Sequence, residues 1–157
     1  MTATPPPLSH TVRLTVRFKE SDLLGIVWHG NYVTYLEDAR QALGVQIGLS
    51  YEDFMRQRFA APIVDLRLQY KRPAKYGDKL DVTASLVWQE VPKFVHRYEI
   101  RRSSDSELLT TAETTQVLLH PDGSLALNFP PFVEAVRERW RRNEIKVAGK
   151  TETSPFG

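Results

Sequence analysis

The sequence contains no cysteine, and this absence narrows what the protein can be. Without thiols it can form no disulfide, hold no thiolate-bound metal and use no cysteine nucleophile, and nothing marks it for export. Long apolar runs are also missing, since no stretch approaches the roughly 20 residues that a membrane-spanning helix needs. The N-terminus, MTATPPPLSH, lacks the charged and apolar regions of a signal peptide. We therefore expect a cytoplasmic protein with no membrane span.

The sequence also lacks an excess of charge of either sign. The 157 residues include 21 basic and 19 acidic side chains, which gives a formal net charge of +2. This nearly balanced composition does not indicate a nucleic-acid-binding protein. At 41% hydrophobic and 25% charged residues, the chain fits one globular domain with a core. We divide it into a flexible N-terminal segment (1–10), a folded domain (11–142) and a C-terminal tail (143–157).

Periodicity predicts the first elements of the folded domain. Apolar residues alternate with polar ones from Val12 to Phe18, which indicates a half-buried strand. A helical stripe then predicts a long helix that begins near Gly30 or Asn31 and ends at Gly44 or Gly48. The stripe consists of Tyr32, Tyr35, Leu36, Ala39 and Leu43. Ser50 and Asp53 have the spacing of a capping box and predict a second, short helix.

The rest of the domain is rich in strands. Alternation and turn residues predict four of them, over about 64–70, 80–88, 94–100 and 108–120. Pro130 and Pro131 suit the first turn of a terminal helix. One long early helix followed by strands with short connections predicts an α+β fold. We expect a five-stranded antiparallel sheet with the long helix across one face, plus the C-terminal helix.

The stretch SDLLGIVWHGNYVTYLEDAR, residues 21–40, joins the first strand to the long helix. Asp22 lies in this connection, and the backbone N–H groups at the helix start have no partners within the helix. A carbonyl oxygen placed there would be polarised, and a nearby carboxylate could attack the carbonyl or activate water. The alternative is purely structural: Asp22 caps a turn and His29 is a hydrogen-bonded residue at the helix start. Spacing alone favours this second interpretation.

The same stretch resembles the signature of the 4-hydroxybenzoyl-CoA thioesterase family, a hotdog-fold group that includes YbgC-like acyl-CoA thioesterases. The pattern is roughly D-x-x-G-[IV]-V-[WY]-[HY]-x-x-Y. The matching residues are Asp22, Gly25, Ile26, Val27, Trp28, His29 and Tyr32. The resemblance extends over about residues 11–142 and also includes YKRPAKYGDKL and FVHRYEIRR. It implies a hotdog fold, in which the antiparallel sheet wraps around the long helix.

The resemblance also implies roles for individual residues. Asp22 takes the place of the catalytic carboxylate, as nucleophile or general base. The backbone N–H of His29 takes the place of the group that binds the thioester oxygen, and its side chain would orient water or assist proton transfer. The surrounding residues are then expected to bind substrate: Gly25, Ile26, Val27, Trp28, Gly30, Asn31 and Tyr32. Family members place the site between two protomers, which implies a homodimer or a tetramer.

Two positions depart from the family pattern. Family members often carry a second acid two residues before the catalytic aspartate, and Glu20 stands there. Some members hold the CoA phosphates with a basic cluster before the fourth strand, where this chain has only Lys93. We therefore expect the phosphates to find other cations, with Arg72, Arg101 and Arg102 as candidates beside Lys93.

Other polar residues have simpler explanations. The four histidines lack metal-ligand spacing, so no metal or cofactor is expected. His96 alternates with apolar residues on a strand and should pack in the core or at an interface. Glu37, on the long helix, is expected in a solvated salt bridge and is the next candidate for a catalytic acid. Ser50 is read as a helix cap, because it lacks the setting of a nucleophile elbow.

These observations predict an acyl-CoA thioester hydrolase that releases a free acid and CoA. Three alternatives stay open: a thioesterase for acyl groups on a carrier protein, a non-catalytic acyl-CoA-binding protein, and a dehydratase. Asp22 argues against a pure binding protein, and the lack of a histidine on the long helix argues against a dehydratase. The acyl group is left open as aromatic, short-chain or long-chain.

Overall fold

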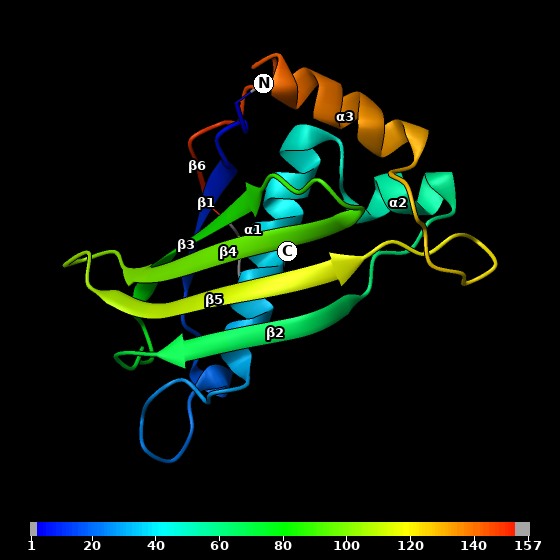
Figure 1. The fold of residues 1–157 in the computed structure, drawn as a ribbon. Coiled ribbons are helices and arrows are strands. Elements are labelled where there is room, and N and C mark those ends of the chain that lie inside the picture. Colours follow the sequence, from blue (N-terminus) through cyan, green and yellow to red (C-terminus); the bar gives the residue numbers. More distant parts are fainter. Residues whose placement is uncertain (1–2, 153–157) are drawn as a thin grey trace.

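The computed structural model describes residues 3–152, which form a six-stranded sheet and the helices that pack against it (Figure 1). The strand order is β2-β5-β4-β3-β1-β6. The strands are β1 (Leu8–Thr15), β2 (Ile63–Tyr70), β3 (Lys79–Val87), β4 (Lys93–Arg102), β5 (Leu108–Val117) and β6 (Lys150–Glu152). The first five pair antiparallel as predicted, whereas β6 pairs parallel to β1 and makes the sheet mixed.

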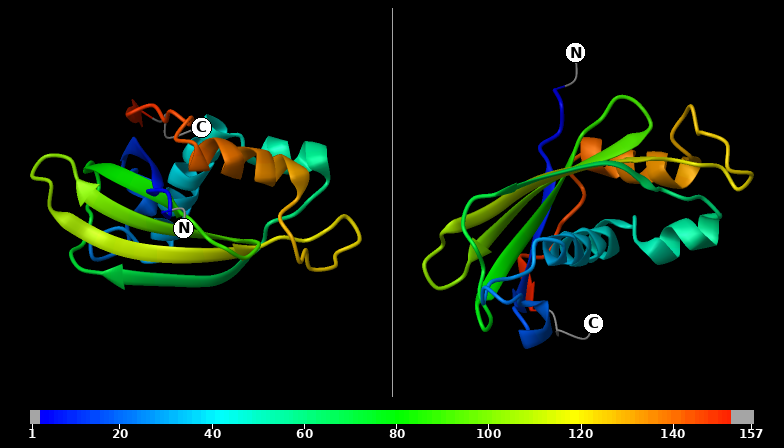
Figure 2. Two further views of the ribbon diagram at one scale, coloured as in Figure 1. Left: turned by 45° about the horizontal axis from the view of Figure 1, so that its top comes forward. Right: turned by 90° about the horizontal axis from the view of Figure 1, so that it is seen from below.

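Helix α1 (Asn31–Ile47) crosses the sheet and packs on β1 and β3 (Figures 1 and 2). It begins at Asn31 and ends at Gly48, whose φ of +84° places it in the left-handed region that favours glycine. Every residue of its predicted stripe is buried. This sheet wrapped around a long helix is the hotdog fold that the resemblance implied.

The shorter helices lie at different ends of the molecule, with α2 and α3 near the C-terminal end of α1 and η1 near its start (Figure 1). They are η1 (Phe18–Glu20, a 3-10 turn), α2 (Tyr51–Gln57) and α3 (Pro131–Arg141). Helix α2 has the predicted capping box, in which the Ser50 side chain accepts from the Asp53 N–H and the Asp53 carboxylate accepts from the Ser50 N–H. Pro130 is the N-cap of α3 and Pro131 its first residue. Among residues 3–152, no helix combines the length and apolarity needed to cross a membrane.

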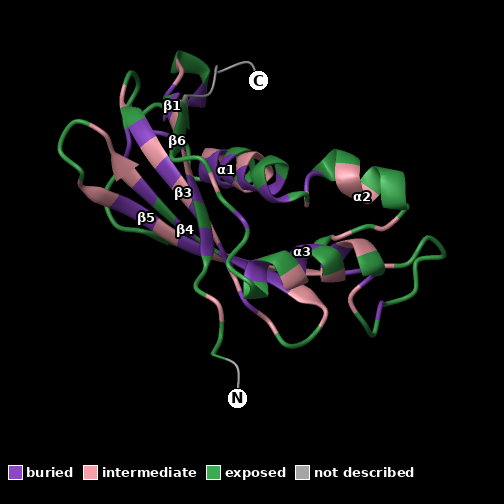
Figure 3. Cartoon of the chain, turned by 90° about the horizontal axis from the view of Figure 1, so that it is seen from above, coloured by how far each residue is buried: buried purple, intermediate pink, exposed green. Residues whose placement is uncertain are grey.

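The core lies between α1 and the strands it faces. Buried and less buried residues alternate along β3 and β5 in Figure 3, as expected for strands with one covered face. Val12, Val82 and Ile100 lie side by side on neighbouring strands and are fully buried. These rows fix the sheet register, because a shift by one residue would turn them outward.

Both chain ends take more part in the fold than the sequence predicts. Strand β1 begins at Leu8, within the segment expected to be flexible, and His10 is buried in the apolar row. After residue 142, Ile145 packs into the core and β6 pairs with β1. A buried histidine interrupts the alternation at the start, and a three-residue polar strand has no pattern of its own, so neither is visible in the sequence.

Strand β2 forms the free edge of the sheet and stays largely exposed. Its residues Ile63, Val64 and Leu66 keep 39%, 59% and 39% of their surface accessible. Helix α1 packs mainly on β1 and β3, towards the other edge of the sheet, so these side chains are only partly covered within residues 3–152. An apolar edge strand of this kind is a pairing surface for another chain.

Candidate active site

The connection between η1 and α1 is a tight loop that projects beyond β2 in the view of Figure 1. The Asp22 N–H donates to the Ile26 carbonyl (2.8 Å), and the Gly25 N–H donates to the Asp22 carbonyl (3.0 Å). Gly25 has a φ of +77°, which side chains rarely tolerate. The turn therefore requires the glycine of the D-x-x-G pattern, and it leaves Leu23 and Leu24 fully in solvent.

Glu20 anchors both ends of this loop. Its carbonyl accepts from the Trp28 N–H (2.9 Å) and from the Asn31 side-chain amide (2.8 Å). Its buried carboxylate accepts from the Arg17 N–H (2.7 Å) and the Tyr35 hydroxyl (3.1 Å). Burial and the Glu20 charge raise the pKa of Tyr35, which keeps its proton on the hydroxyl. The contacts of Glu20 therefore hold the loop in place.

The carboxylate of Asp22 combines features of both sequence interpretations. Its Oδ1 accepts from the Leu24 N–H at 2.8 Å, which is the turn-capping contact of the structural alternative. Within residues 3–152, its Oδ2 has no hydrogen-bond partner. The side chain is partly exposed. One oxygen therefore fixes the orientation of the carboxylate, and the other is available to a ligand.

The start of α1 offers backbone N–H groups beside this loop. The Asn31 N–H donates to the Trp28 carbonyl (2.9 Å), but no described residue accepts from the His29 N–H, and no side chain caps the helix. The Tyr70 hydroxyl donates to the His29 carbonyl at 2.7 Å, which ties the end of β2 to the helix start. The His29 ring is exposed and packs on Trp28, with ring centroids 4.7 Å apart. The helix start is therefore open to an oxyanion.

Trp28 lies across the backbone at Gly30. A Cβ atom at Gly30 would stand 2.1 Å from a carbon of the Trp28 ring, so a larger residue at position 30 would displace the indole. The indole is itself half-exposed. Trp28 thus forms an apolar wall at the helix start.

Other predicted substrate-binding residues are turned into the fold. Val27 is buried, and its N–H donates to the Ala74 carbonyl (2.8 Å). Tyr32 is also buried, and its hydroxyl accepts from the Ala74 N–H (3.1 Å). Ile26 forms a bridge with Lys75. These three fasten the loop to segment 74–75, so they shape the site from behind.

The four predicted phosphate-binding cations do not form one group. Arg102 pairs with Asp78, Asp105 and Glu107, and Arg72 shares Glu107. Arg101 pairs with Glu99. Lys93 begins β4 whereas Arg101 and Arg102 end it, a separation of about 30 Å along a strand. A single phosphate clamp from these four residues is therefore excluded within one protomer.

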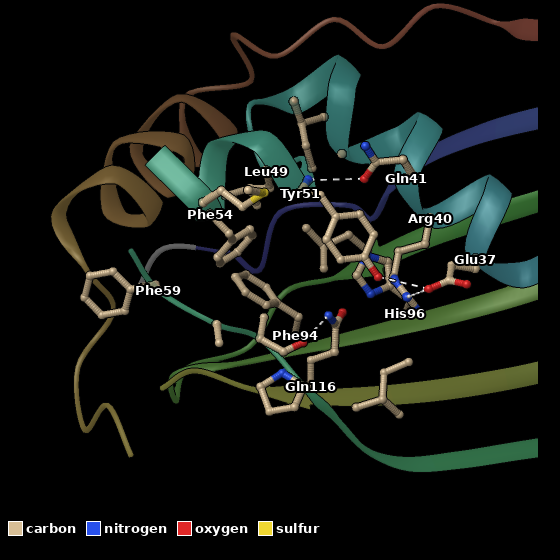
Figure 4. Close-up of a pocket in the computed structure, with 18 of the residues that line it drawn as sticks. Glu37, Arg40, Gln41, Leu49, Tyr51, Phe54, Phe59, Phe94, His96 and Gln116 are labelled. Atoms are coloured by element: carbon tan, nitrogen blue, oxygen red, sulfur yellow. Dashed lines mark hydrogen bonds and ion pairs between the residues drawn. The ribbon is translucent and has the colours of Figure 1, made fainter. Parts of the chain in front are cut away.

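A cavity of about 580 Å³ lies at the opposite end of β2 (Figure 4). The C-terminal half of α1, helix α2 and the adjoining ends of β2, β4 and β5 surround it. Most of its wall is apolar, including Ile47, Leu49, Phe54, Phe59 and Phe94. No sequence pattern predicts this cavity, because its wall comes from segments that are distant in the chain.

Three polar residues in the cavity wall, Glu37, Arg40 and Tyr51, form a connected group. The Tyr51 hydroxyl donates to Glu37 (2.9 Å), and Arg40 pairs with the same carboxylate (3.6 Å). Arg40 also donates to the Tyr98 hydroxyl (3.4 Å). Glu37 thus has the salt bridge that the sequence predicted, and its carboxylate also faces a cavity.

His96 is the most deeply buried polar residue of the cavity wall. It is 7% exposed, and no described residue hydrogen-bonds its Nδ1. Burial, with the nearby Arg40 charge, lowers the pKa of His96 to about 3. The ring is therefore neutral, with one donor nitrogen and one acceptor nitrogen. Among the described residues, no cluster of three or more His, Asp or Glu side chains could hold a metal ion.

The chain is similar in sequence to a family of known proteins and to individual enzymes. Residues 16–138 match the family model of the thioesterase-like superfamily. The chain is 26% identical over 145 residues to 1,4-dihydroxy-2-naphthoyl-CoA hydrolase of a Picosynechococcus species, covering 89% of this chain and 97% of that one. It is 26% identical over 106 residues to the acyl-CoA thioester hydrolase YbgC of Escherichia coli O157:H7, covering 68% and 78%.

A solved structure is similar to this chain in both fold and sequence. The DHNA-CoA thioesterase of Staphylococcus aureus superimposes with a TM-score of 0.75 at 29% identity, covering 90% of this chain and 97% of that one. The family model spans the loop of Asp22, helix α1 and all of β2 to β5. The chain therefore belongs to the thioesterase-like superfamily.

Proposed function

We propose that this thioesterase hydrolyses acyl-CoA, with the Asp22 carboxylate as the catalytic acid–base or nucleophilic group and the N–H of His29 as the donor to the thioester oxygen. The observation that carries the proposal is their juxtaposition. A carboxylate with a free oxygen lies in the loop that leads into an uncapped helix start. Relatives named as acyl-CoA thioester hydrolases support the substrate class.

The two groups supply complementary parts of the reaction. The helix start stabilises negative charge on the carbonyl oxygen as the carbonyl carbon becomes tetrahedral. Asp22 either attacks that carbon or removes a proton from the attacking water. The carbon–sulfur bond then breaks, the CoA sulfur leaves as a thiolate that takes up a proton, and the acid is released. In the nucleophilic route, water hydrolyses the intermediate anhydride and regenerates Asp22.

Within one protomer, the cavity and the helix start lie at opposite ends of β2. Ile63 at the start of β2 lines the cavity, whereas Tyr70 at its end bonds the His29 carbonyl. Seven residue steps of a strand separate them by about 23 Å. The Ile63 end of the cavity therefore lies well away from the Asp22 of the same protomer, although Glu37, at the near end, is about 9 Å along α1 from the helix start.

Antiparallel pairing of β2 with its copy would bring the two places together. It would align the Ile63 end of one strand with the Tyr70 end of the other, and so bring the partner's Asp22 to the cavity. The exposed apolar edge of β2 supports this pairing. In the proposed homodimer, each site combines the Asp22 loop of one chain with the cavity of the other.

Substitution of Asp22 tests the proposal. Asp22→Asn preserves the size and can still accept from the Leu24 N–H, so we expect the protein to stay folded. We expect kcat to fall by about 10²–10⁴-fold, with little change in KM. The measurement is thiol release from aromatic, short-chain and long-chain acyl-CoAs, with the thermal midpoint recorded for each variant.

Asp122 provides a matched control. Its Oδ1 accepts from the Ser124 N–H at 2.9 Å, the same turn contact that Asp22 makes with Leu24. Asp122→Asn should therefore change stability as Asp22→Asn does and leave kcat intact. If Asp22→Asn unfolds the protein, the carboxylate is structural. If it hydrolyses normally, the catalytic acid lies elsewhere, and Glu37→Gln is the next variant to measure.

A further inference from the structure

We infer that the tip of the Asp22 loop, Leu23 and Leu24, docks against helix α2 of a second copy of this chain, on the side chains of Tyr51 and Met55. This inference rests on the homodimer of the proposed function, in which β2 pairs with its copy. It goes further by naming a second contact surface of that dimer, apart from β2, and the residues that meet there.

The loop tip presents two leucines on a backbone that is held in place. Leu23 is fully exposed, and Leu24 keeps 79% of its surface accessible. The Leu24 N–H donates to the Asp22 carboxylate at 2.8 Å, and the Gly25 N–H donates to the Asp22 carbonyl at 3.0 Å. Apolar side chains that a fixed turn holds together in water are typical of a surface that binds a partner.

Helix α2 presents a second exposed apolar surface. Tyr51 and Met55 are four residues apart, so their side chains share one face of the helix. They keep 54% and 76% of their surface accessible, and none of the seven residues of α2 is buried. The Tyr51 hydroxyl donates to Glu37 at 2.9 Å, which fastens this face to α1. Helix α2 therefore has an apolar face that its own chain leaves open.

The symmetry of the proposed dimer brings the two surfaces together. The loop adjoins the end of β2 where Tyr70 bonds the His29 carbonyl, and it extends past the β2 edge, where the copy would lie (Figure 1). Helix α2 adjoins the other end, since Tyr51, Met55 and Ile63 line the same cavity. A two-fold axis through an antiparallel β2 pair exchanges the two ends. Each chain thus offers its loop tip to α2 of the other, and the dimer contains this contact twice.

The area of the strand pair indicates that the dimer needs such a contact. The eight residues of β2 extend about 26 Å, and a sheet edge about 10 Å deep then covers about 260 Å² on each chain. Stable interfaces bury about 800 Å² on each partner. Pairing of β2 supplies about a third of that area, so the rest must come from surfaces at the ends of the strand. The loop tip and α2 are exposed apolar surfaces at those two ends.

Single cysteines test the contact directly, because the chain has no thiol of its own. Leu24→Cys and Met55→Cys are prepared separately, one of them with a tag that changes its size, then co-refolded and treated with a short bismaleimide. About half of the dimers are mixed, and each has one contact with a thiol on both sides. We therefore expect up to about half of the chains in a cross-linked pair of unequal sizes. Each variant alone should give no cross-linked pair, because the symmetry places unlike residues against each other.

Leu127 provides a matched control for the cross-linking. It has the same 76% exposure as Met55, but it does not line the cavity. Leu127→Cys, co-refolded with Leu24→Cys in place of Met55→Cys, should therefore give no cross-linked pair.

Removal of the leucine tests what the contact contributes. Leu24→Ser keeps the N–H that bonds Asp22, so we expect an unchanged far-ultraviolet circular dichroism spectrum. Both contacts of the dimer lose an apolar side chain, so the dissociation constant should rise by about 10- to 100-fold, as measured by analytical ultracentrifugation. Leu127→Ser, which removes a similarly exposed leucine elsewhere, should leave the dissociation constant unchanged.

The outcomes separate this inference from the proposed function. If the cross-linked pair forms but the wild type hydrolyses no acyl-CoA, the proposed function fails and the contact stands. If the wild type is active but the pair does not form, or forms as readily with Leu127→Cys, the contact is wrong while the function stands. A dissociation constant that Leu24→Ser leaves unchanged would also overturn the contact, because the leucines would then serve some other partner.

Discussion

The carboxylates of Glu20, Asp22 and Glu37 have different roles, and their contacts distinguish these roles. Glu20 is buried and anchors the loop, Asp22 keeps one oxygen free, and Glu37 pairs with Arg40 at the cavity. The sequence could single out Asp22, because its spacing to Gly25 and to the helix start follows a local motif. The contacts of Glu20 with Tyr35, and the cavity position of Glu37, depend on packing that local sequence does not encode.

His96 makes stability sensitive to acid. Its pKa lies near 3 in the folded protein against 6.5 for the unperturbed group, so between these values the unfolded chain binds a proton that the folded chain does not. Its contribution to the free energy of unfolding is thus unimpaired above pH 6.5 and falls by about 1.4 kcal/mol per pH unit below it. The charged groups facing it are Arg40 and, beyond that, Glu37.

We therefore expect His96→Phe to reduce the acid sensitivity. Between pH 7 and pH 5, the variant should lose about 2 kcal/mol less stability than the wild type, as measured by urea unfolding at the two pH values. Thr110→Val, which removes a buried group that does not titrate, should lose as much as the wild type. Equal losses in His96→Phe and the wild type would show that the ring is not held neutral in the fold.

At the scale of elements, local signals located the helices well and the sheet edges poorly. Helix α1 begins and ends where the stripe and Gly48 indicated, and α2 has the capping box of Ser50 and Asp53. These signals act within a few residues of the chain. Strand β6 depends instead on the distant β1, and β2 alternates like a half-buried strand although nearly all of its residues are exposed.

Strand β6 is held by His10. The His10 Nδ1 lies 2.9 Å from the Ala148 carbonyl, so it carries the proton, and Nε2 accepts from the Thr151 hydroxyl at 2.9 Å. Lys150 adds an ion pair with Asp81 at 3.0 Å. Together these contacts cover the edge of β1 that would otherwise be open to pairing.

Removal of the chain after Ala148 should uncover that edge. We expect the free energy of unfolding to drop by about 1–3 kcal/mol, and the amides of Thr11 to Arg13 to exchange faster with solvent. Activity per folded molecule should persist, since β6 and β2 border opposite edges of the sheet. Hydrogen exchange and thermal unfolding are the measurements. Unchanged protection of β1 would mean that β6 contributes nothing to the edge.

At the scale of the whole molecule, the proposed homodimer divides each active site between two chains. The sequence suggested a shared site only through its family resemblance. Its physical basis is the distance of about 23 Å along β2 between Tyr70, which bonds the helix start, and Ile63 at the far end of the cavity. No periodicity in the chain places Tyr70 against the helix start, because that contact depends on how β2 lies relative to α1.

Mixing two inactive variants tests this division. One is Asp22→Asn, and the other is Ala61→Trp, which fills the cavity from its wall. If sites are shared, co-refolded mixtures should recover up to about a quarter of wild-type activity, because half of the dimers are mixed and each has one intact site. If each site lies within one chain, no activity returns. Each variant refolded alone is the control.

The free edge of β2 also links catalysis to concentration. In the proposed dimer, separated chains possess every residue of the site yet lack any complete site, so dilution below the dissociation constant would silence the enzyme without unfolding it. An acyl group bound across the two chains would oppose that separation by mass action. The substrate would then help to assemble the catalyst that consumes it, and the enzyme would respond more than proportionally to its own abundance.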